Sequence, residues 1–117
     1  MTGSTLTIFD CDGVLVDSED AANRVMVEAL AGIGFEIGLA DCMARFVGKS
    51  MATVQAEVAA ETGRAFPAGW AEEIRARTIE TLQRERVAAI PGIREVVDAH
   101  RAMGRPYCVA SSGRIEK

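Results

Sequence analysis

Apolar residues follow two different patterns along this chain. Residues 6–9 form a short continuous apolar run that is followed at once by the polar residues 10–13, a pattern that predicts a buried strand ending in a tight turn. Residues 105–110, which are Arg-Pro-Tyr-Cys-Val-Ala, form a second stretch that is apolar after its first residue and is followed by the small polar residues 111–113. We therefore expect two buried strands, each of which ends in a polar turn.

Between the two runs, apolar residues recur three or four positions apart, as they do on one face of an α-helix. Helices are expected after the polar residues 17–20, at residues 39–46, from Ser50 to Gly63, from Pro67 onward, and at residues 93–103. The residues expected to face inward on these helices are Ala22, Val25, Met26, Ala29, Leu30, Ile33, Met51, Val54, Val58, Ala59, Trp70, Ile74, Ile79, Leu82, Val96, Val97 and Ala99.

The order of these elements predicts an α/β protein. Two buried strands separated by helices belong to one parallel sheet in this pattern, and the connection between them here carries a large insertion. We place the domain boundaries so that residues 1–16 and 89–117 form the core and residues 17–88 form an inserted all-helical domain.

The charge of the chain excludes a general nucleic-acid binder. Its 117 residues carry a net charge of −4, and the arginines alternate with acidic residues instead of forming a basic face. No apolar run is long enough to span a bilayer, and no signal peptide is visible, so no membrane partner is expected. A small anionic substrate remains compatible with this charge, because one or two well-placed cations are enough to bind it.

The three cysteines, Cys11, Cys42 and Cys108, have neither the spacing of metal ligands nor the pattern of a disulfide framework. Cys11 and Cys108 fall in strand-like apolar runs and are expected to be buried, reduced thiols. This cysteine usage and the absence of a visible leader predict a cytoplasmic protein.

The polar turns after the two strands hold the candidate chemistry. Because ligands bind beyond the carboxyl ends of parallel strands, Asp10, Asp12 and Ser111 are expected at one edge of the sheet. Two crowded carboxylates are stabilised by a divalent cation such as Mg²⁺. One carboxylate can then attack a phosphorus atom to form an aspartyl-phosphate, while the other protonates the leaving oxygen. Ser111, with the backbone N–H groups of Ser112 and Gly113, can donate to phosphate oxygens.

Each of these features also has an ordinary structural interpretation. An Asp-x-Asp-Gly sequence after a strand is often a plain turn, and Ser-Ser-Gly is often a loop. Residues 17–19 are most simply a helix cap, Lys49 a solvated lysine at a helix end, and His100 a surface residue. The functional interpretation is favoured by the joint pattern, in which both polar turns end parallel strands at one edge.

Residues 9–19, Phe-Asp-Cys-Asp-Gly-Val-Leu-Val-Asp-Ser-Glu, closely resemble the first signature of the haloacid dehalogenase superfamily. The match is nearest to the phosphatase and phosphomutase branch, in which a helical cap is inserted after the first strand. Residues 90–93 resemble the return to the core, and residues 109–112 resemble the second signature. The resemblance implies a Rossmannoid parallel sheet, of which this chain holds the first two core strands, with an inserted α-helical cap domain.

The same resemblance implies roles for individual residues. Asp10 would be the nucleophile and a Mg²⁺ ligand, Asp12 the general acid/base with its backbone carbonyl on the metal, and Ser111 the phosphate-binding hydroxyl. Gly48 and Lys49 would lie on the substrate side of the cap. The expected function is that of a Mg²⁺-dependent phosphatase of small phosphorylated metabolites, sugar phosphates above all.

The family continues past the second signature to a lysine and an acidic pair that complete the metal site, whereas this chain stops at Lys117. We expect the N-terminal part of a longer enzyme, inactive or nearly so alone, with an uncovered core sheet that favours self-association. Cap closure is expected about hinges near residues 16–17 and 89–90. The alternatives are a phosphomutase of the same family and a truncated, non-catalytic protein that binds Mg²⁺ or a partner. A receiver domain fits less well, because it has no such insertion.

Overall fold

The computed structural model of this chain describes residues 3 and 5–111, and it divides into two compact units. One unit combines the start of the chain up to Glu19 with the part from Val87 onward, and the other is Asp20–Arg86. The first is built on strands and one helix, and the second is entirely helical. None of the helices in the described part of the chain is both long and apolar enough to cross a membrane.

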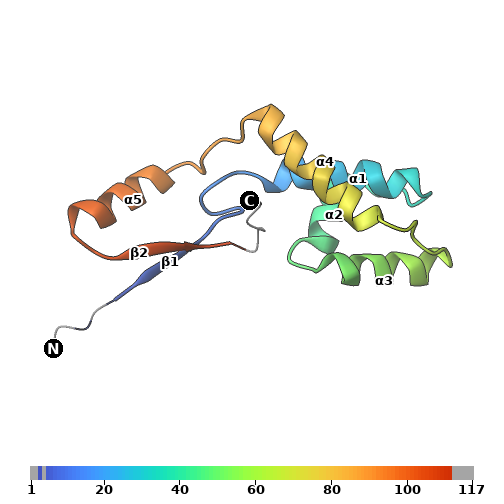
Figure 1. Cartoon of the computed structure of the whole chain (residues 1–117), viewed down its shortest axis with the longest axis horizontal. Coiled ribbons are helices and arrows are strands. Elements are labelled where there is room, and N and C mark those ends of the chain that lie inside the picture. The colour runs from blue at the N-terminus through green and yellow to red at the C-terminus, as the bar shows by residue number, and fades with distance from the viewer. Residues whose placement is uncertain (1–2, 4, 112–117) are drawn as a thin grey trace. The chain divides into compact units, whose positions relative to one another are not determined.

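The first unit contains a pair of parallel strands. β1 (Thr7–Asp10) pairs with β2 (Tyr107–Ala110) in parallel, and the register places Asp10 opposite Ala110 at the end of both strands. Helix α5 (Ile93–Ala102) precedes β2 and lies along one face of the pair (Figure 1). The predicted α/β fold with a parallel sheet is therefore confirmed, and both strands end at the same edge.

His100 attaches α5 to the strands. Its Nδ1 lies 2.8 Å from the Val96 carbonyl oxygen and its Nε2 lies 2.9 Å from the Thr7 hydroxyl, while its ring makes edge contacts with Phe9 and Tyr107. The prediction of a surface position for His100 was wrong, because the helix turns the side chain toward the strands.

The face that α5 buries differs from the one expected. Ile93, Val97 and His100, spaced four and three positions apart, are half-buried, whereas Val96 is 43% exposed and Ala99 is also exposed. The apolar pattern predicted that Val96, Val97 and Ala99 face inward, and of these three only Val97 lies on the packed face. A single histidine with two hydrogen-bond partners can instead replace an apolar residue on the packed face.

The opposite face of the strand pair is open in the described part of the chain. Side chains alternate along a strand, so Thr7, Phe9 and Tyr107 face α5 whereas Ile8 and Cys108 point the other way. Ile8 is 61% exposed and Cys108 is exposed as well. The expectation of a buried Cys108 thiol was therefore wrong. Its strand is as predicted, but burial would also require a second layer on that face.

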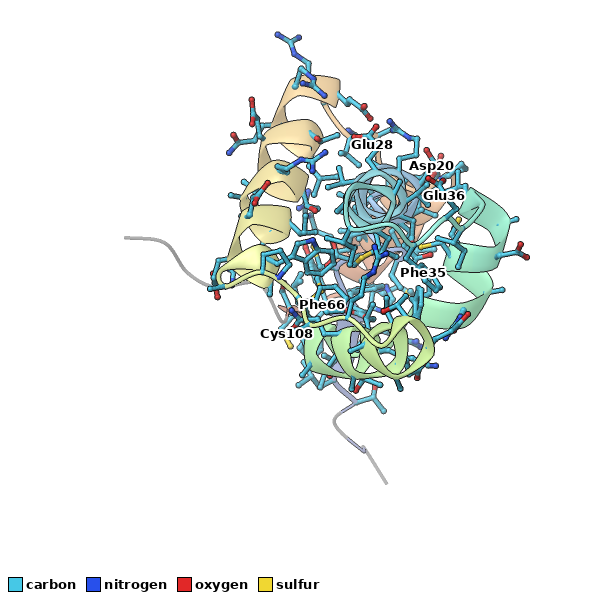
Figure 2. The ribbon with its side chains drawn as sticks, turned by 90° about the vertical axis from the view of Figure 1, so that its right-hand side faces the viewer. Asp20, Glu28, Phe35, Glu36, Phe66 and Cys108 are labelled. Atoms are coloured by element: carbon cyan, nitrogen blue, oxygen red, sulfur yellow. The ribbon has the colours of Figure 1, made fainter. Side chains whose placement is uncertain are left out.

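The helical unit has its own apolar core, formed between α1 (Glu19–Gly32), α2 (Leu39–Phe46), α3 (Met51–Thr62) and α4 (Trp70–Glu85). Phe35 and Phe66, in the loops, pack into or against this core (Figure 2). Most of the buried positions are those that the helical periodicity predicted. The core consists of Val25, Ala29, Leu30, Phe35, Cys42, Phe46, Val54, Val58, Trp70 and Ile74.

The ends of these helices show where local signals were sufficient. Ser50 caps α3, because its Oγ accepts a hydrogen bond of 3.2 Å from the Thr53 N–H, and Gly63 ends the same helix with φ +66°. Both boundaries agree with the prediction. Helix α4, in contrast, begins at Trp70 and not at Pro67, because Gly69 at φ +77° interrupts the helical path between them.

An ion pair joins the first and last helices of this unit. The Arg24 guanidinium donates to both carboxylate oxygens of Glu85, over 3.1 Å and 2.7 Å, and also pairs with Asp20 one turn earlier on α1. Hydrogen bonding to Glu85 raises the pKa of Arg24 and lowers that of Glu85. The two-pronged contact fixes the start of α1 against the end of α4.

Candidate active site

The two strand ends bring Asp10 and Ser111 to one edge of the sheet. Asp10 is the last residue of β1, and Ser111 directly follows its register partner Ala110 at the end of β2. Both residues are exposed. The expected neighbourhood of these two positions is therefore built into the strand register. Ser112 and Gly113, the other predicted phosphate-binding residues, lie outside the described residues.

The turn after β1 is closed by backbone hydrogen bonds. The Cys11 carbonyl accepts from the N–H groups of Val14, Leu15 and Val16 at 3.3, 2.9 and 3.2 Å, and Gly13 N–H donates to the Val16 carbonyl at 2.9 Å. The Asp10 Oδ1 accepts from the Cys11 N–H at 2.8 Å, which orients the carboxylate and leaves its second oxygen available. The chain therefore presents Asp10 from a folded turn and not from a loose loop.

Asp12 is held by a serine that the sequence analysis assigned elsewhere. The Ser18 hydroxyl donates to Asp12 Oδ1 over 2.8 Å, and Ser18 is only 4% exposed. Residues 17–19 were interpreted as a helix cap, and Ser18 does directly precede α1, but its hydroxyl also donates to Asp12 at the strand end. A hydroxyl six residues after a candidate acid is too general a pattern for the sequence alone to identify this contact.

The two segments that connect the units are hydrogen-bonded to each other. Asp17 N–H donates to the Ala88 carbonyl over 2.9 Å, and Ile90 N–H donates to the Leu15 carbonyl over 3.1 Å. Val16 and Ala89 thus form an antiparallel bridge at the position where the sequence predicted hinges. The two connecting segments therefore lie side by side, next to the turn that contains Asp12.

Gly13 is a position where only glycine fits without strain. Its φ is +74°, and a Cβ would lie 2.8 Å from the Glu19 carboxylate oxygen Oε1. We expect Gly13→Ala to destabilise the protein by about 1–3 kcal/mol, measured by urea unfolding. Gly104→Ala is the matched control, because Gly104 has a similar φ of +62° but no atom within 4 Å of a Cβ. Equal losses in the two variants would show that Glu19 simply moves aside.

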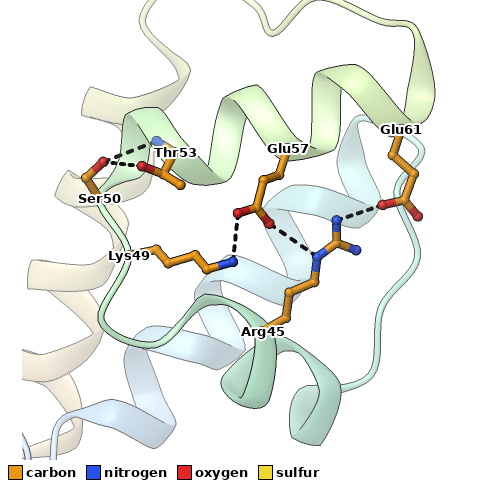
Figure 3. Close-up of polar contacts among 6 residues, drawn as sticks. All are labelled: Arg45, Lys49, Ser50, Thr53, Glu57 and Glu61. Carbon is orange, nitrogen blue, oxygen red and sulfur yellow. Dashed lines mark hydrogen bonds and ion pairs between the residues drawn. The ribbon is translucent and has the colours of Figure 1, made fainter.

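Gly48 and Lys49, the predicted substrate-side residues, belong to the helical unit. They lie in the loop between α2 and α3, where Gly48 adopts φ +81° and precedes the α3 cap Ser50. The Lys49 ammonium is 2.7 Å from the Glu57 carboxylate (Figure 3). Lys49, which could also be interpreted as a solvated lysine at a helix end, is 38% exposed and is an ion-pair partner on the surface of this unit.

The strand-end turn after β1 offers oxygen atoms of the kind that bind a magnesium ion. The turn's hydrogen bonds go to the carbonyls of Cys11 and Val16, so the Asp12 carbonyl and the Asp10 Oδ2 remain as oxygen donors. Mg²⁺ prefers oxygen ligands, commonly one or two carboxylates with several waters. Across the described residues, no three or more His, Cys, Asp or Glu side chains come together as a metal site.

Comparison with known proteins identifies the family. The family model for haloacid dehalogenase-like hydrolases matches residues 5–117. The chain belongs to this family. The haloacid dehalogenase resemblance of the two strand-end motifs is thereby confirmed, together with its α/β fold.

Individual relatives of this haloacid dehalogenase-like chain agree with the assignment. The 6-phosphogluconate phosphatase of Escherichia coli K12 is 30% identical over 109 residues, which are 93% of this chain and 48% of that protein. A haloacid dehalogenase-like protein of unknown function from Agrobacterium tumefaciens C58 is 29% identical with a TM-score of 0.81, over 96% of this chain and 49% of that one.

A family hydrolase from Deinococcus radiodurans R1, crystallised with bound phosphate and sodium, is also 29% identical, with a TM-score of 0.68 over 95% of this chain and 47% of that one. The chain thus spans about half the length of each of these relatives.

Proposed function

We propose that this chain contributes the nucleophile and the acid/base of a phosphatase that acts on small phosphorylated metabolites, sugar phosphates above all. The observation that carries the proposal is the placement of Asp10 and Ser111 at the ends of two paired parallel strands, in a chain of a hydrolase family. A relative named 6-phosphogluconate phosphatase supports a phosphate ester as substrate.

The reaction proceeds in two steps at the Asp10 carboxylate. Its unbonded oxygen attacks the phosphorus atom, an aspartyl-phosphate forms, and the bond to the ester oxygen breaks. Asp12 donates a proton to that leaving oxygen, then accepts a proton from the water that attacks the aspartyl-phosphate. The products are free phosphate, the alcohol and the restored carboxylate. Ser18, through its hydrogen bond, keeps the Asp12 carboxylate in one orientation during both transfers.

The phosphate would be bound by the second strand end. The Ser111 hydroxyl and the backbone N–H groups of Ser112 and Gly113 are donors of the kind that bind phosphate oxygens at a strand-to-helix turn. A Mg²⁺ ion held by the Asp10 carboxylate and the Asp12 carbonyl would neutralise charge on the phosphate and the nucleophile. Each group in this proposal comes from one of the two turns.

In this proposal the helical unit is the cap domain. We assign residues 17–88 to it, with Gly48 and Lys49 on its substrate side and the paired segments around Val16 and Ala89 as its hinges. A closing cap would exclude water and complete the contacts that select the substrate.

Phosphate release from an aryl phosphate tests the proposal directly. We expect a protein of the relatives' full length that contains this chain to release phosphate from p-nitrophenyl phosphate with Mg²⁺ present, and to stop when the metal is removed with EDTA. The 117 residues alone should release little or none. Absence of Mg²⁺-dependent release by the folded full-length protein would contradict the proposal, and robust release by the 117 residues alone would contradict the expectation that this chain is inactive by itself. With a sugar phosphate, transfer of the phosphoryl group to a second sugar hydroxyl instead of water would identify a phosphomutase.

Ser18→Ala tests the orienting role of this buried hydroxyl. We expect a loss of about 1 kcal/mol in stability, because one hydrogen bond to a carboxylate is removed, and a fall in phosphate release, because Asp12 is no longer held. Thr78→Ala is the control, since Thr78 also loses one hydroxyl hydrogen bond, to the Ile74 carbonyl, but within α4. Equal effects of both variants on phosphate release would show that Ser18 acts only through stability.

A further inference from the structure

A polar hollow of about 200 Å³ lies between α1 and α4 of the helical unit. Apart from Val25, the side chains that line it are all polar or charged: Arg24 and Glu28 from α1, and Arg77, Glu80, Thr81 and Arg84 from α4. The α4 positions are three or four residues apart where they are not adjacent, so they form one face of that helix. The shared core of the unit fixes the two helices that build this hollow.

The hydroxyl of Thr81 lines the hollow without a partner of its own. Thr81 is only 8% exposed, yet no hydrogen bond joins its hydroxyl to any residue that the structure describes. The hydroxyls of Thr62 and Thr78, in contrast, each donate over 2.8 Å to the carbonyl four residues earlier. No fully buried side-chain nitrogen or oxygen of the described residues lacks a partner, so the Thr81 oxygen reaches the hollow. A nearly buried hydroxyl without a hydrogen bond favours a ligand that supplies one.

The arginines of the hollow have more N–H donors than their acidic partners use. A guanidinium has five such donors. Arg24 uses three of them in its contacts with two acids, and Arg77 uses one, toward Glu28. The Arg84 guanidinium forms no hydrogen bond or ion pair with a side chain in the described part of the chain, although its charge, after Arg24, helps to lower the pKa of Glu85. The hollow therefore offers donors to an anion, above all from Arg84.

The spacing of these cations favours a ligand with more than one carboxylate. Arg77 and Arg84 are seven residues apart, which is about 10 Å along a helix, and Thr81 lies between them in the sequence. A ligand with two anionic groups spans this spacing better than one with a single charge. The planar guanidinium also matches a carboxylate, as Arg24 shows by donating to both oxygens of Glu85.

We propose that this hollow binds a small dicarboxylate or tricarboxylate. One carboxylate binds Arg84 and the Thr81 hydroxyl, and another binds Arg77, which Glu28 shares. Glu80 also lines the hollow, and its negative charge opposes the ligand and limits the affinity. The site lies wholly within the helical unit, so the inference does not depend on the proposed function.

Calorimetry with citrate on the full 117-residue chain, without Mg²⁺, tests the inference. We expect a dissociation constant of about 1 mM, because exposed ion pairs stabilise a complex only weakly. Arg84→Gln and Thr81→Val should each weaken binding about 3- to 5-fold, since each removes one donor. Glu80→Gln should tighten it about 2-fold, because it removes a repulsive charge. Arg75→Gln is the control and should leave it unchanged, since Arg75 lies on α4 but does not line the hollow.

The opposite signs expected for Arg84→Gln and Glu80→Gln separate a binding site from a general loss of structure. Thr81→Val should also keep the melting temperature of the chain, because no hydrogen bond is lost. Equal weakening by Arg84→Gln and Arg75→Gln would show that citrate senses only total charge, and this would overturn the inference. Failure of the unaltered chain to bind citrate, or binding of acetate or sulfate as tightly as citrate, would overturn it too.

Discussion

Replacing Asp10 with asparagine is expected to reduce Mg²⁺-dependent phosphate release by about a thousandfold or more, because the amide cannot form the aspartyl-phosphate. The side chain keeps its size, and its oxygen can still accept the Cys11 N–H that orients Asp10. Folding should therefore be unaffected, as circular dichroism would check. The rate is measured with p-nitrophenyl phosphate in a protein of the relatives' full length that contains this chain.

Two further variants show whether the effect is specific to the nucleophile. Asp12→Asn should reduce the rate by about 10²–10⁴-fold, the usual effect of losing a general acid/base. Asp17→Asn is the control, since Asp17 is an exposed acid of the same segment that pairs through its backbone N–H with Ala88. A similar loss of rate in Asp17→Asn would mean that the total charge of the segment matters and not the identity of Asp10.

Truncation of Leu30 to alanine is expected to lower the free energy of unfolding by about 2–5 kcal/mol. Leu30 lies on α1 and is fully buried, at 0% exposure, in the core that this helix forms with the other helices of the unit. Removing its branched end takes away apolar contacts and leaves a cavity that fixed helices cannot close. Urea unfolding followed by the helical circular dichroism signal measures the change.

Leu82→Ala provides the matched comparison on α4. Leu82 has the same side chain but is only half-buried, so its truncation should cost about 1 kcal/mol. Losses of equal size for Leu30 and Leu82 would contradict the assignment of Leu30 to the centre of this core.

The sequence predicted most of the secondary structure because its signals are local. Ser50 and Gly63 mark the ends of α3 through their own backbone preferences, and the three-to-four-residue spacing of Val54 and Val58 predicts the buried face. The approach of Asp10 to Ser111 was also predictable, although the residues are far apart in the chain. Parallel strands end at one edge, so two polar turns after two such strands meet there.

Contacts between distant side chains could not be predicted in the same way. His100 was expected at the surface, yet it bonds to Thr7, 93 residues away in the sequence. The Cys108 thiol was expected to be buried and is exposed, because burial depends on the layers that cover a strand and not on its apolar pattern. The hydrogen bond from Ser18 to Asp12 and the ion pair between Glu57 and Lys49 could likewise be recognised only in the structure.

The sequence by itself determined the family motifs, the order of strands and helices, and the presence of two carboxylates at a strand end. These follow from backbone preferences and periodicity, which act over a few residues. Only the tertiary structure decided which groups hold those carboxylates and cations in place. Ser18 on Asp12 and Glu57 on Lys49 are such choices, because a hydrogen bond requires two atoms within about 3 Å, and the fold alone sets that distance.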